Sequence, residues 1–502
     1  MADAPPEPAT SPQLYRPRAA EHTVLYRIVR EHLATFLRTA AEHHDGGLPA
    51  FVEQEFRDFL TCGVWSRGFA RFRCDACHAE RLVPFSCKGR VCPSCGGRRM
   101  AERAAHLVDH VLPAVPIRQW VLSLPHRLRY LLAWDHGLCR AVLRIYARAL
   151  LAFLRRRARR QGIADGRSGA VTAIQRFGSA VNCNVHYHTL VPDGVFAPDA
   201  SGALHFVGLP APTDHEVARL LGTIARRIER LLRRRGLAPD EDTGAAVDPV
   251  AEDAPLLAAL SRASVAGQSL LGRRHGAPVL RVGRDPDAPW VTSTGPRHAH
   301  LAGFDLHANR TVRADDRVGL EKLCHYLLRP PLAQERLELL PDGRVCCTLA
   351  HPWSDGTRAF LFEPLEFLEK LAVLIPRPRI NLLLYHGIFA AHARERTSVV
   401  GPSATHDDTD RGSMTPAGPA TEVPRAALPP RKYYAWADLM RRVFAIDILA
   451  CACGGRLRFI ATIEDPVVVQ RILRHVGLPT DTPAPAAARQ PPGPEPAFAF
   501  PA

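Results

Sequence analysis

Lysine is scarce in this chain of 502 residues and stands only at positions 88, 322, 370 and 432. The formal net charge is nevertheless +15, so arginine carries nearly all of the positive charge. A strongly basic chain favours a polyanionic partner. Abundant Arg, Ala, Pro and Gly are also typical of GC-rich genomes, so the charge by itself gives only modest support for nucleic-acid binding.

Long apolar runs are missing as well. No uncharged apolar stretch reaches about 18 residues, which excludes a transmembrane helix and a membrane partner. The first residues, MADAPPEPATSPQ, lack the basic segment and apolar core of a signal peptide. We therefore expect a cytoplasmic protein, in which the 13 cysteines serve as metal ligands or core residues rather than as disulfides.

Hydrophobic periodicity predicts a mixture of helices and strands, and no fixed-period repeat is present. Apolar spacing is helical over residues 21–60, 130–160, 213–235, 315–328 and 365–374. Alternating or β-branched runs predict strands over residues 117–125, 170–180, 344–350 and 357–363.

Composition marks the segments that do not belong to a folded core. Residues 1–20 are Pro-rich and predicted to be disordered, as is the Ala/Pro tail at 480–502. A Pro/Asp/Ala-rich insertion lies near 237–255, and a Pro/Thr/Ser/Gly-rich linker covers 397–430. Residues 431–479 are then predicted to form a small C-terminal unit.

The stretch CDACHAERLVPFSCKGRVCPSC contains two CxxC pairs, Cys74/Cys77 and Cys92/Cys95, separated by 14 residues. Each CxxC turn places two thiolates on one side of a knuckle, and two knuckles supply the four sulfurs of a structural zinc site. Cys87 is an alternative ligand, and His78 is a weaker one. Free cysteines in a small core are the less favoured alternative.

Four basic residues surround this cysteine cluster: Lys88, Arg90, Arg98 and Arg99. They would allow a zinc module to contact phosphates, although a solvated surface explains the same charges. A second cysteine motif, Cys451-Ala452-Cys453, precedes two glycines. It is CxC rather than CxxC, so we interpret it as a degenerate knuckle and assign it no metal.

The stretch VNCNVHYHTLVPDGVF, residues 181–196, predicts a strand that carries two histidines. Alternate residues of a strand share a face, so His186 and His188 lie on one side, while Val185 and Tyr187 lie on the other. Two adjacent imidazoles are suited to binding one divalent metal ion. A half-exposed polar edge of the sheet is the alternative interpretation.

The stretch LEKLCHYLLRPP predicts a helix that ends at its two prolines. Lys322, Tyr326 and Arg329 share one face of this helix. A tyrosine, a pair of cations and a His-bound metal form a coherent set for attack on a phosphodiester, with Tyr326 as the nucleophile. Considered without the other motifs, Tyr326 would be an ordinary half-buried tyrosine.

Several fragments together resemble rolling-circle insertion-sequence transposases of the IS91 type, which carry an HUH nuclease domain behind a zinc-binding domain. The most specific are FSCKGRVCPSCGGRRMAERAAHLVDHVLP, QRFGSAVNCNVHYHTLVPDGVF and LCHYLLRPPLAQERL. The resemblance implies an α+β fold in which a ferredoxin-like antiparallel sheet carries the histidines on a central strand. It also implies a helical and zinc-binding domain over 21–112 and a catalytic domain over 113–396.

The same resemblance implies a function. His186 and His188 would form the HUH motif and bind Mg²⁺ or Mn²⁺, and Tyr326 would nick single-stranded element ends through a 5′-phosphotyrosine. Lys322 and Arg329 would contact the DNA. A plasmid replication initiator or relaxase, which uses the same chemistry, and an inactive zinc DNA-binding regulator are the alternatives. The oligomeric state is not predicted.

The chain departs from the family pattern in two places. Some relatives have a second tyrosine four residues earlier on the helix, where this chain has Lys322, which predicts a single-tyrosine enzyme. Relatives usually show CxxC where this chain has Cys451-Ala452-Cys453. A third metal ligand is expected, with Gln175 and Asp193 as open candidates, and Tyr385 is expected to be structural or to contact DNA.

Overall fold

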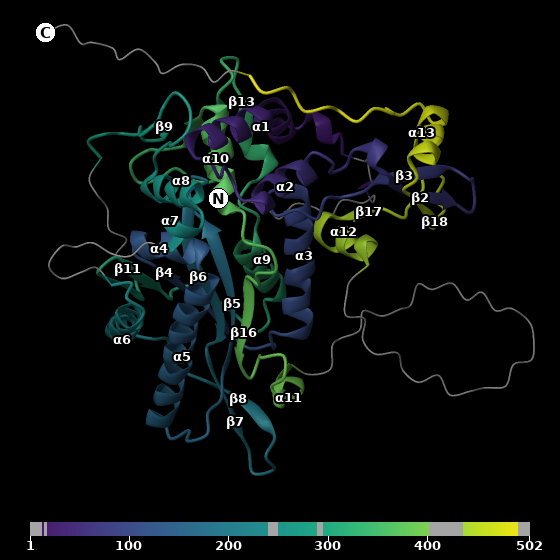
Figure 1. Cartoon of the computed structure of the whole chain (residues 1–502). Helices are drawn as coiled ribbons and strands as arrows, with labels where there is room; N and C mark the ends of the chain where they lie inside the picture. Colours follow the sequence, from purple (N-terminus) through teal and green to yellow (C-terminus); the bar gives the residue numbers. More distant parts are fainter. Residues whose placement is uncertain (1–12, 15–17, 239–248, 289–294, 401–434, 490–502) are drawn as a thin grey trace, which may run out of the picture.

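A computed structural model describes residues 13–14, 18–238, 249–288, 295–400 and 435–489 (Figure 1). Most of the predicted disordered N-terminus, the centre of the 237–255 insertion and nearly all of the predicted 397–430 linker lie outside the described residues. No described helix is both long enough and apolar enough to cross a membrane.

The N-terminal region consists of helices and a small hairpin that projects to one side of them (Figure 1). Helix α1 (Val24–His43) begins at the N-cap Thr23, whose hydroxyl accepts a hydrogen bond from the backbone of Tyr26. Helix α2 (Ala50–Phe59) follows, and then the hairpin of β2 (Phe69–Cys74) and β3 (Glu80–Pro84). Helix α3 (Pro93–His110) starts directly at the predicted cysteine cluster, with proline in its first turn.

Within the described residues, the largest sheet has seven strands in the order β10-β11-β4-β6-β5-β16, with β12 also pairing to β4. All of its pairings are antiparallel. The strands are β4 (Ile117–Ser123), β5 (Gly169–Phe177), β6 (Cys183–Pro192), β10 (His298–Leu301), β11 (Phe304–His307), β12 (Thr311–Val312) and β16 (Leu383–Gly387). The α+β class is therefore confirmed, and β6, which carries the histidines, lies between β4 and β5.

Helices cover both faces of this sheet (Figure 1). Helices α4 (His126–Trp134) and α5 (His136–Arg160) cover one face, where Tyr187 of β6 stacks on Tyr146 and its hydroxyl donates to the Cys139 carbonyl. Helix α6 (Asp214–Arg234) packs beside α5. Helix α9 (Arg317–Leu328), which packs along α3, covers the other face. The predicted alternation along β6 is thus correct.

Other elements extend the two main regions. The hairpin of β7 (Gly194–Pro198) and β8 (Leu204–Gly208) follows β6. A four-stranded sheet has the order β13-β14-β15-β9. Its strands are β9 (Leu280–Val282), β13 (Leu337–Leu339), β14 (Val345–Thr348) and β15 (Ala359–Phe362), and the helices of this part are α7 (Pro249–Asp253), α8 (Pro255–Ala266) and α10 (Pro364–Leu374). Helix α11 (Arg396–Val400) lies beside β8.

The C-terminal segment packs against the N-terminal hairpin. Helix α12 (Trp436–Phe444) and strand β17 (Ile446–Asp447) lead to β18 (Leu457–Ile463), which pairs with β2 to make the sheet β18-β2-β3. The short strand β1 (Gln13–Leu14) pairs with β17. After α13 (Pro466–His475), the described start of the predicted tail, residues 480–489, reaches α1, where the Ala486 amide donates to the Arg30 carbonyl.

Candidate metal and nucleic-acid site

The two histidines of β6 lie side by side, on the face of the sheet covered by α9. The Nε2 atoms of His186 and His188 are 3.0 Å apart, and their ring centroids are 4.8 Å apart. His188 is 3% exposed. The bulk of the domain therefore shields the pair from water on most sides.

Hydrogen bonds fix how the two rings are turned. The Nδ1–H of His186 donates to the carbonyl of Asn184 at 2.8 Å, which leaves its Nε2 lone pair free to accept. The side-chain amide of Gln119, from the neighbouring strand β4, lies 2.9 Å from Nδ1 of His188. Nδ1 of His188 is protonated if the Gln119 amide presents its oxygen to that atom, and unprotonated if the amide presents its NH₂ group.

Both imidazoles are neutral at neutral pH. Burial lowers the pKa of His186 to about 4, and the positive charges of Arg129 and Arg329 act in the same direction. Burial also lowers the pKa of His188 well below its ordinary value, with further contributions from His186 and Arg329. A metal ligand must be a neutral imidazole, so the environment prepares both rings for that role.

The donor set fits a small divalent ion. An ion with bonds of about 2.1 Å to two neighbouring octahedral ligands places those ligand atoms about 3 Å apart, which matches the Nε2 separation. Gln175, opposite His186 on β5, donates to the carbonyls of Tyr326 and Leu327, while its Oε1 is buried with no hydrogen-bond partner in the described part of the chain. Asp193, the other candidate, is occupied by an ion pair with Arg118.

The predicted nucleophile lies against this pair. The ring of Tyr326 meets the ring of His188 edge-on, with 5.6 Å between centroids, and Tyr326 is 42% exposed. The guanidinium of Arg329 lies 4.9 Å from the centre of the Tyr326 ring. Lys322 is exposed one turn earlier on α9. The structure thus brings together the histidines, the tyrosine and Arg329, which the sequence suggested from separate stretches.

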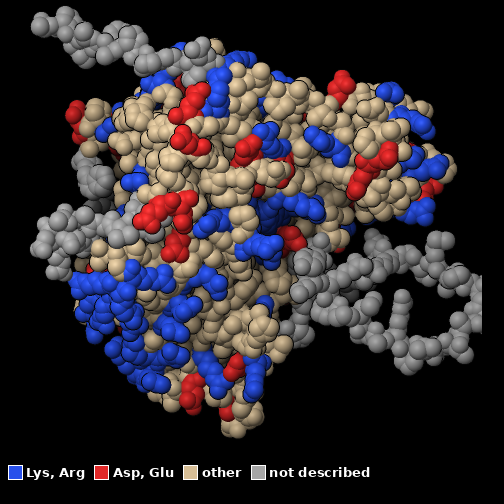
Figure 2. Space-filling view, viewed as in Figure 1, with Lys and Arg blue, Asp and Glu red and all other residues tan. Residues whose placement is uncertain are grey.

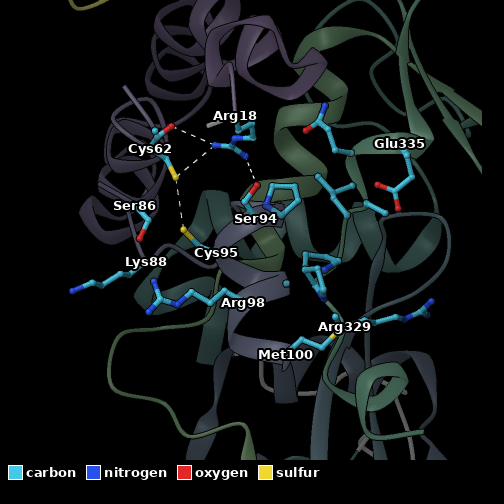
Figure 3. A pocket seen from close by; sticks show the side chains of 18 of the residues that line it. Arg18, Cys62, Ser86, Lys88, Ser94, Cys95, Arg98, Met100, Arg329 and Glu335 are labelled. Carbon is cyan, nitrogen blue, oxygen red and sulfur yellow. Dashed lines mark hydrogen bonds between the residues drawn. The ribbon is translucent and has the colours of Figure 1, made fainter. Parts of the chain in front are cut away.

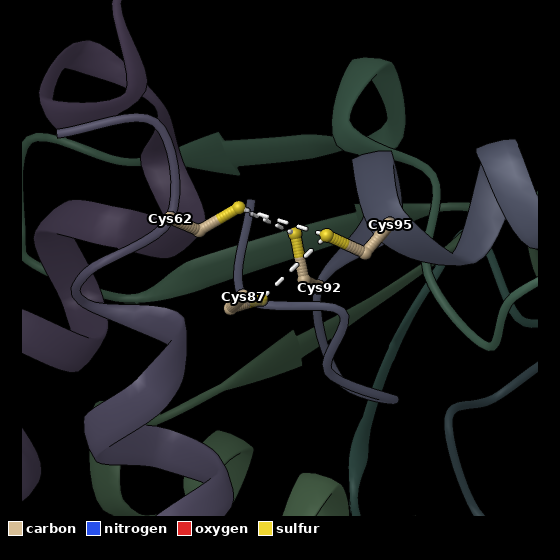
Figure 4. Close-up of side chains that lie close together, drawn as sticks. All are labelled: Cys62, Cys87, Cys92 and Cys95. Atoms are coloured by element: carbon tan, nitrogen blue, oxygen red, sulfur yellow. Dashed lines mark hydrogen bonds between the residues drawn. The ribbon is translucent and has the colours of Figure 1, made fainter. Parts of the chain in front are cut away.

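The predicted zinc ligands form two clusters rather than one, so the grouping of Cys74, Cys77, Cys92 and Cys95 into a single site is wrong. Cys92 and Cys95 meet Cys87 and Cys62, a residue to which we assigned no role (Figure 4). The Sγ–Sγ distances are 3.6 Å for Cys62–Cys92, 3.7 Å for Cys62–Cys95 and 3.6 Å for Cys87–Cys95. Four sulfurs around zinc with bonds of about 2.3 Å lie about 3.8 Å apart, so this set fits the metal.

The other CxxC pair has a distant partner. Cys74 and Cys77 meet Cys451 and Cys453, the CxC motif to which we assigned no metal. The spacing of a CxxC pair shows that its two thiolates act together. It does not show which second pair they meet, because that depends on how β18 pairs with β2.

A cavity of about 1090 Å³ connects the first cysteine cluster with the end of α9 (Figure 3). Lys88 and Arg98, two of the predicted DNA-binding residues, line it together with Arg329. Arg18 also lines it, and its guanidinium donates to the Cys62 carbonyl and lies 3.7 Å from the Cys62 sulfur. The side of α12 that carries Trp436, Met440 and Phe444 closes the cavity.

Arg90 and Arg99 line a second, smaller cavity of about 320 Å³, which Arg329, Gln175 and Tyr385 share. Arg99 also donates to the Lys88 carbonyl at 2.6 Å, so it braces the loop that carries Cys87. Burial raises the pKa of Tyr385, and Arg396 lies 5.6 Å from its ring centre.

The residue predictions did not include the basic surface over α5 and α6. Lys and Arg side chains crowd the lower left of the molecule, over α5 and α6 (Figure 2). Burial and repulsion from neighbouring arginines, first among them Arg227 and Arg160, lower the pKa of Arg156. The exposed arginines are Arg140, Arg144, Arg148, Arg155, Arg156, Arg159 and Arg160 on α5, and Arg219, Arg226, Arg227, Arg230, Arg233 and Arg234 on α6. The helical spacing of these arginines is the sequence pattern that could have identified this surface.

Comparison with known proteins agrees with this arrangement. Residues 28–124 match the family model described as "Transposase zinc-binding domain", and residues 169–397 match the model described as "Putative transposase". The "Transposase for insertion sequence element IS801" of Pseudomonas savastanoi pv. phaseolicola is 23% identical over 430 residues, which cover 84% of this chain and 86% of that protein. No solved structure matches the chain.

The first matched range contains the cluster of Cys62, Cys87, Cys92 and Cys95, and the second contains the two histidines and Tyr326. A transposase zinc-binding domain, followed by a domain that matches the second transposase model, defines a transposase, which is a DNA-processing enzyme that binds DNA. This chain belongs to the IS91-type family of insertion-sequence transposases.

Proposed function

We propose that this transposase nicks single-stranded DNA at the ends of its element through a covalent tyrosine intermediate. The Tyr326 hydroxyl gives up its proton as its oxygen attacks the phosphorus, the bond from phosphorus to the 3′-oxygen breaks, and the released oxygen takes up a proton to become the 3′-hydroxyl. The reverse attack by a 3′-hydroxyl rejoins a strand without a nucleotide cofactor. The observation that carries this proposal is the contact between the exposed Tyr326 ring and the buried His188 ring.

Each residue of the site has a role in this proposal. His186 and His188 would hold Mg²⁺ or Mn²⁺, and the unpartnered Oε1 of Gln175 is the proposed third protein ligand. When bound, such an ion polarises the scissile phosphate and stabilises the charge that develops on it. Arg329 would orient the phosphate beside Tyr326, because its guanidinium already lies over that ring.

The basic surroundings suggest how the DNA is held. A strand that enters the site would pass Lys88 and Arg98 in the cavity next to Arg329. The exposed arginines of α5 and α6 would hold further phosphates without reading their sequence. With no second tyrosine at position 322, one protein molecule would hold one DNA end covalently at a time.

Labelled single-stranded DNA from an element end tests the proposal. Incubated with the protein and Mn²⁺, it should yield a protein–DNA complex that survives a denaturing gel, and EDTA should prevent its formation. Binding of the DNA without any covalent complex would instead support the inactive DNA-binding regulator. Cleavage that leaves no protein on the DNA would contradict a tyrosine intermediate.

The Gln119 side chain provides a test of the metal site that does not depend on catalysis. Replacing Gln119 with leucine removes the partner of His188 Nδ1, so the ring is no longer held in the orientation that suits a ligand. We expect Mn²⁺ affinity, measured by titration calorimetry, to fall by about 10- to 100-fold. Gln119→Glu places a carboxylate oxygen there that can accept from Nδ1–H and should retain the affinity. Equal affinities for the leucine variant and the wild type would contradict the assignment.

Two neighbouring glycines test whether the first cysteine cluster positions the tyrosine helix. A Cβ on Gly96 would lie 2.7 Å from Cβ of Pro330, directly after α9, whereas a Cβ on Gly97 would meet no atom within 4 Å. Gly96→Ala should therefore displace Pro330 and Arg329 and slow adduct formation by up to about 100-fold, because small shifts of reacting groups are costly. Adduct formation is measured as a single-turnover rate on labelled DNA.

Gly97→Ala is the matched control and should leave both the rate and the zinc content unchanged. Gly96→Ala should also keep its zinc, since neither change touches a cysteine. Equal rates for the two variants would show that the contact between α3 and Pro330 does not control the site.

A further inference from the structure

We propose that Cys74, Cys77, Cys451 and Cys453 bind a second zinc ion, which fastens the C-terminal segment to the zinc-binding domain. Two of these ligands lie beyond residue 124, where the match to the zinc-binding family ends. The site therefore joins parts of the chain that are more than 370 residues apart. It does not depend on the proposed nicking reaction.

The four sulfurs have the geometry of a closed zinc site. Sγ of Cys74 lies 3.6 Å from Sγ of Cys453, Sγ of Cys77 lies 3.6 Å from Sγ of Cys451, and all four lie within 4.8 Å of one another. A disulfide would need about 2.05 Å. Tetrahedral zinc with bonds of about 2.3 Å needs about 3.8 Å. The first cluster, in the domain matched as zinc-binding, shows the same 3.6–3.7 Å separations.

The backbone forms two opposed knuckles. In the first, the turn between β2 and β3 closes with a hydrogen bond from the His78 amide to the Cys74 carbonyl, and His78 has a φ of 58°. In the second, the Cys451 amide donates to the Gly455 carbonyl, and Gly454 has a φ of 82°. A CxC motif thus serves as a knuckle here, because the glycine turn after Cys453 directs its sulfur back towards Cys74.

Gly455 packs tightly against the sulfurs. A Cβ at this position would be 3.0 Å from Sγ of Cys74 and 3.2 Å from Sγ of Cys453. The Gly455 amide also points to Sγ of Cys453 at 3.4 Å, as in a hydrogen bond to a thiolate. This close packing is consistent with four sulfurs bound to one metal ion. Such an ion needs no ligand beyond the four cysteines.

Apolar packing near the sulfur end of β18 is small, and the other buried cluster of this region, Phe69, Leu82, Val469 and Leu473, lies at the opposite end of the strand. The buried cluster next to the sulfurs consists of Cys74, Cys451 and Leu457, and Phe459 and Ile460 of β18 are 53% and 41% exposed. Small folds with little buried core are typically stabilised by a metal or by disulfides. A zinc ion held by two thiolates from each side supplies that stability here.

The fastened segment also reaches the candidate active site. Arg442 of α12 pairs with Asp109 of α3 at 2.6 Å and with Glu321 of α9 at 3.0 Å, one turn before Tyr326. The same helix closes the cavity that Lys88, Arg98 and Arg329 line. The second zinc would therefore hold one wall of that cavity in place.

Zinc content of the full-length protein tests the proposal directly. Plasma mass spectrometry should find two zinc ions per chain in the wild type and half that content in Cys451→Ser/Cys453→Ser. Cys346→Ser, in β14 and outside both clusters, is the matched control and should retain two ions. One ion per chain in the wild type, or two in the double variant, would overturn the second site.

Hydrogen exchange tests the fastening. Amides of β18 that pair with β2 should exchange at least about tenfold faster in the double variant, while those of β6 should not change. Unchanged exchange in β18 would show that zinc does not hold the strand.

Two single variants replace the double variant if it cannot be purified. Cys77→Ser, which removes an exposed ligand at the hairpin turn, should also lose one ion. Cys453→His, which keeps a ligand at that position, should retain two. Failure of either expectation would overturn the proposal.

Discussion

Replacing Tyr326 with phenylalanine is expected to abolish the covalent protein–DNA complex while leaving DNA binding nearly unchanged. The change removes one oxygen atom, and the ring keeps its contacts with His188 and Arg329. No other hydroxyl in this arrangement replaces the nucleophile, so adduct formation should fall below detection. Affinity for single-stranded DNA should stay within about twofold of the wild type, because it depends mainly on the basic residues.

Tyr385→Phe is the matched control for this experiment. Tyr385 belongs to the same domain, but it lies on β16, against the Arg396 guanidinium. Loss of its hydroxyl should leave the rate of adduct formation within a few-fold of the wild type. An adduct that persists in the Tyr326 variant and disappears in the Tyr385 variant would transfer the nucleophilic role to Tyr385.

Replacing Lys370 with methionine is expected to destabilise the fold by about 3–5 kcal/mol, because it leaves a buried carboxylate without its partner. Lys370 and Glu369 of α10 are 1% and 2% exposed. Nζ of Lys370 lies 2.8 Å from Glu369, and it also donates to the Gln268 carbonyl. Glu369 in turn accepts from the amides of Leu270 and Leu271, so the pair holds that loop onto α10. Urea unfolding measures the loss.

The size of this loss should depend on pH. Burial already raises the pKa of Glu369, and removal of the Lys370 charge would raise it further. A carboxyl group whose pKa is higher in the folded state destabilises the fold increasingly as the pH rises above its unfolded pKa. The deficit of Lys370→Met should therefore shrink at acid pH.

Two controls accompany the Lys370 variant. Glu369→Gln/Lys370→Met removes both charges and should recover part of the stability. Lys322→Met makes the same substitution at an exposed helix position and should change stability by less than about 0.5 kcal/mol. A Lys370 variant as stable as the Lys322 variant would contradict the account of this buried pair.

Local patterns in the sequence predicted the parts of the candidate site that depend on local geometry. Alternation along 181–196 placed His186 and His188 on one face of a strand, and helical spacing placed Tyr326 and Arg329 on one face of a helix. Both depend on the fixed periodicity of one element. The sequence also suggested a DNA-directed chemistry, but the distance between the strand and the helix is set by packing of α9 on the sheet.

The cysteines show where local reasoning fails. Spacing identified Cys74/Cys77 and Cys92/Cys95 as pairs, and each pair does act together. Cys92 and Cys95 meet Cys87 and a single cysteine in the loop after α2, and Cys74 and Cys77 meet a CxC motif near the C-terminus. Those partners are brought close by strand pairing and by the path of the N-terminal helices. Neither leaves a periodic signal in the sequence.

The arginines of α5 and α6 are a third case. Each helix shows a basic face in the sequence. Helix α6 was predicted near its observed bounds, whereas the single helix predicted over 130–160 is divided at Asp135 into α4 and α5. Only the packing of α6 beside α5 joins the two faces into one surface. A charged surface made by two helices therefore becomes visible only in three dimensions.

The central claim is that Tyr326 forms a covalent bond to DNA at a site whose metal ion is bound by His186 and His188. Peptide mass spectrometry of the covalent complex tests this claim most directly. Wild-type protein would be incubated with single-stranded element-end DNA and Mn²⁺, then digested with a protease and a nuclease. We predict a nucleotide mass on the peptide that contains Tyr326, and its absence in the His186→Ala/His188→Ala variant. A nucleotide mass on any other peptide, or an adduct that forms equally well without the two histidines, would contradict the account.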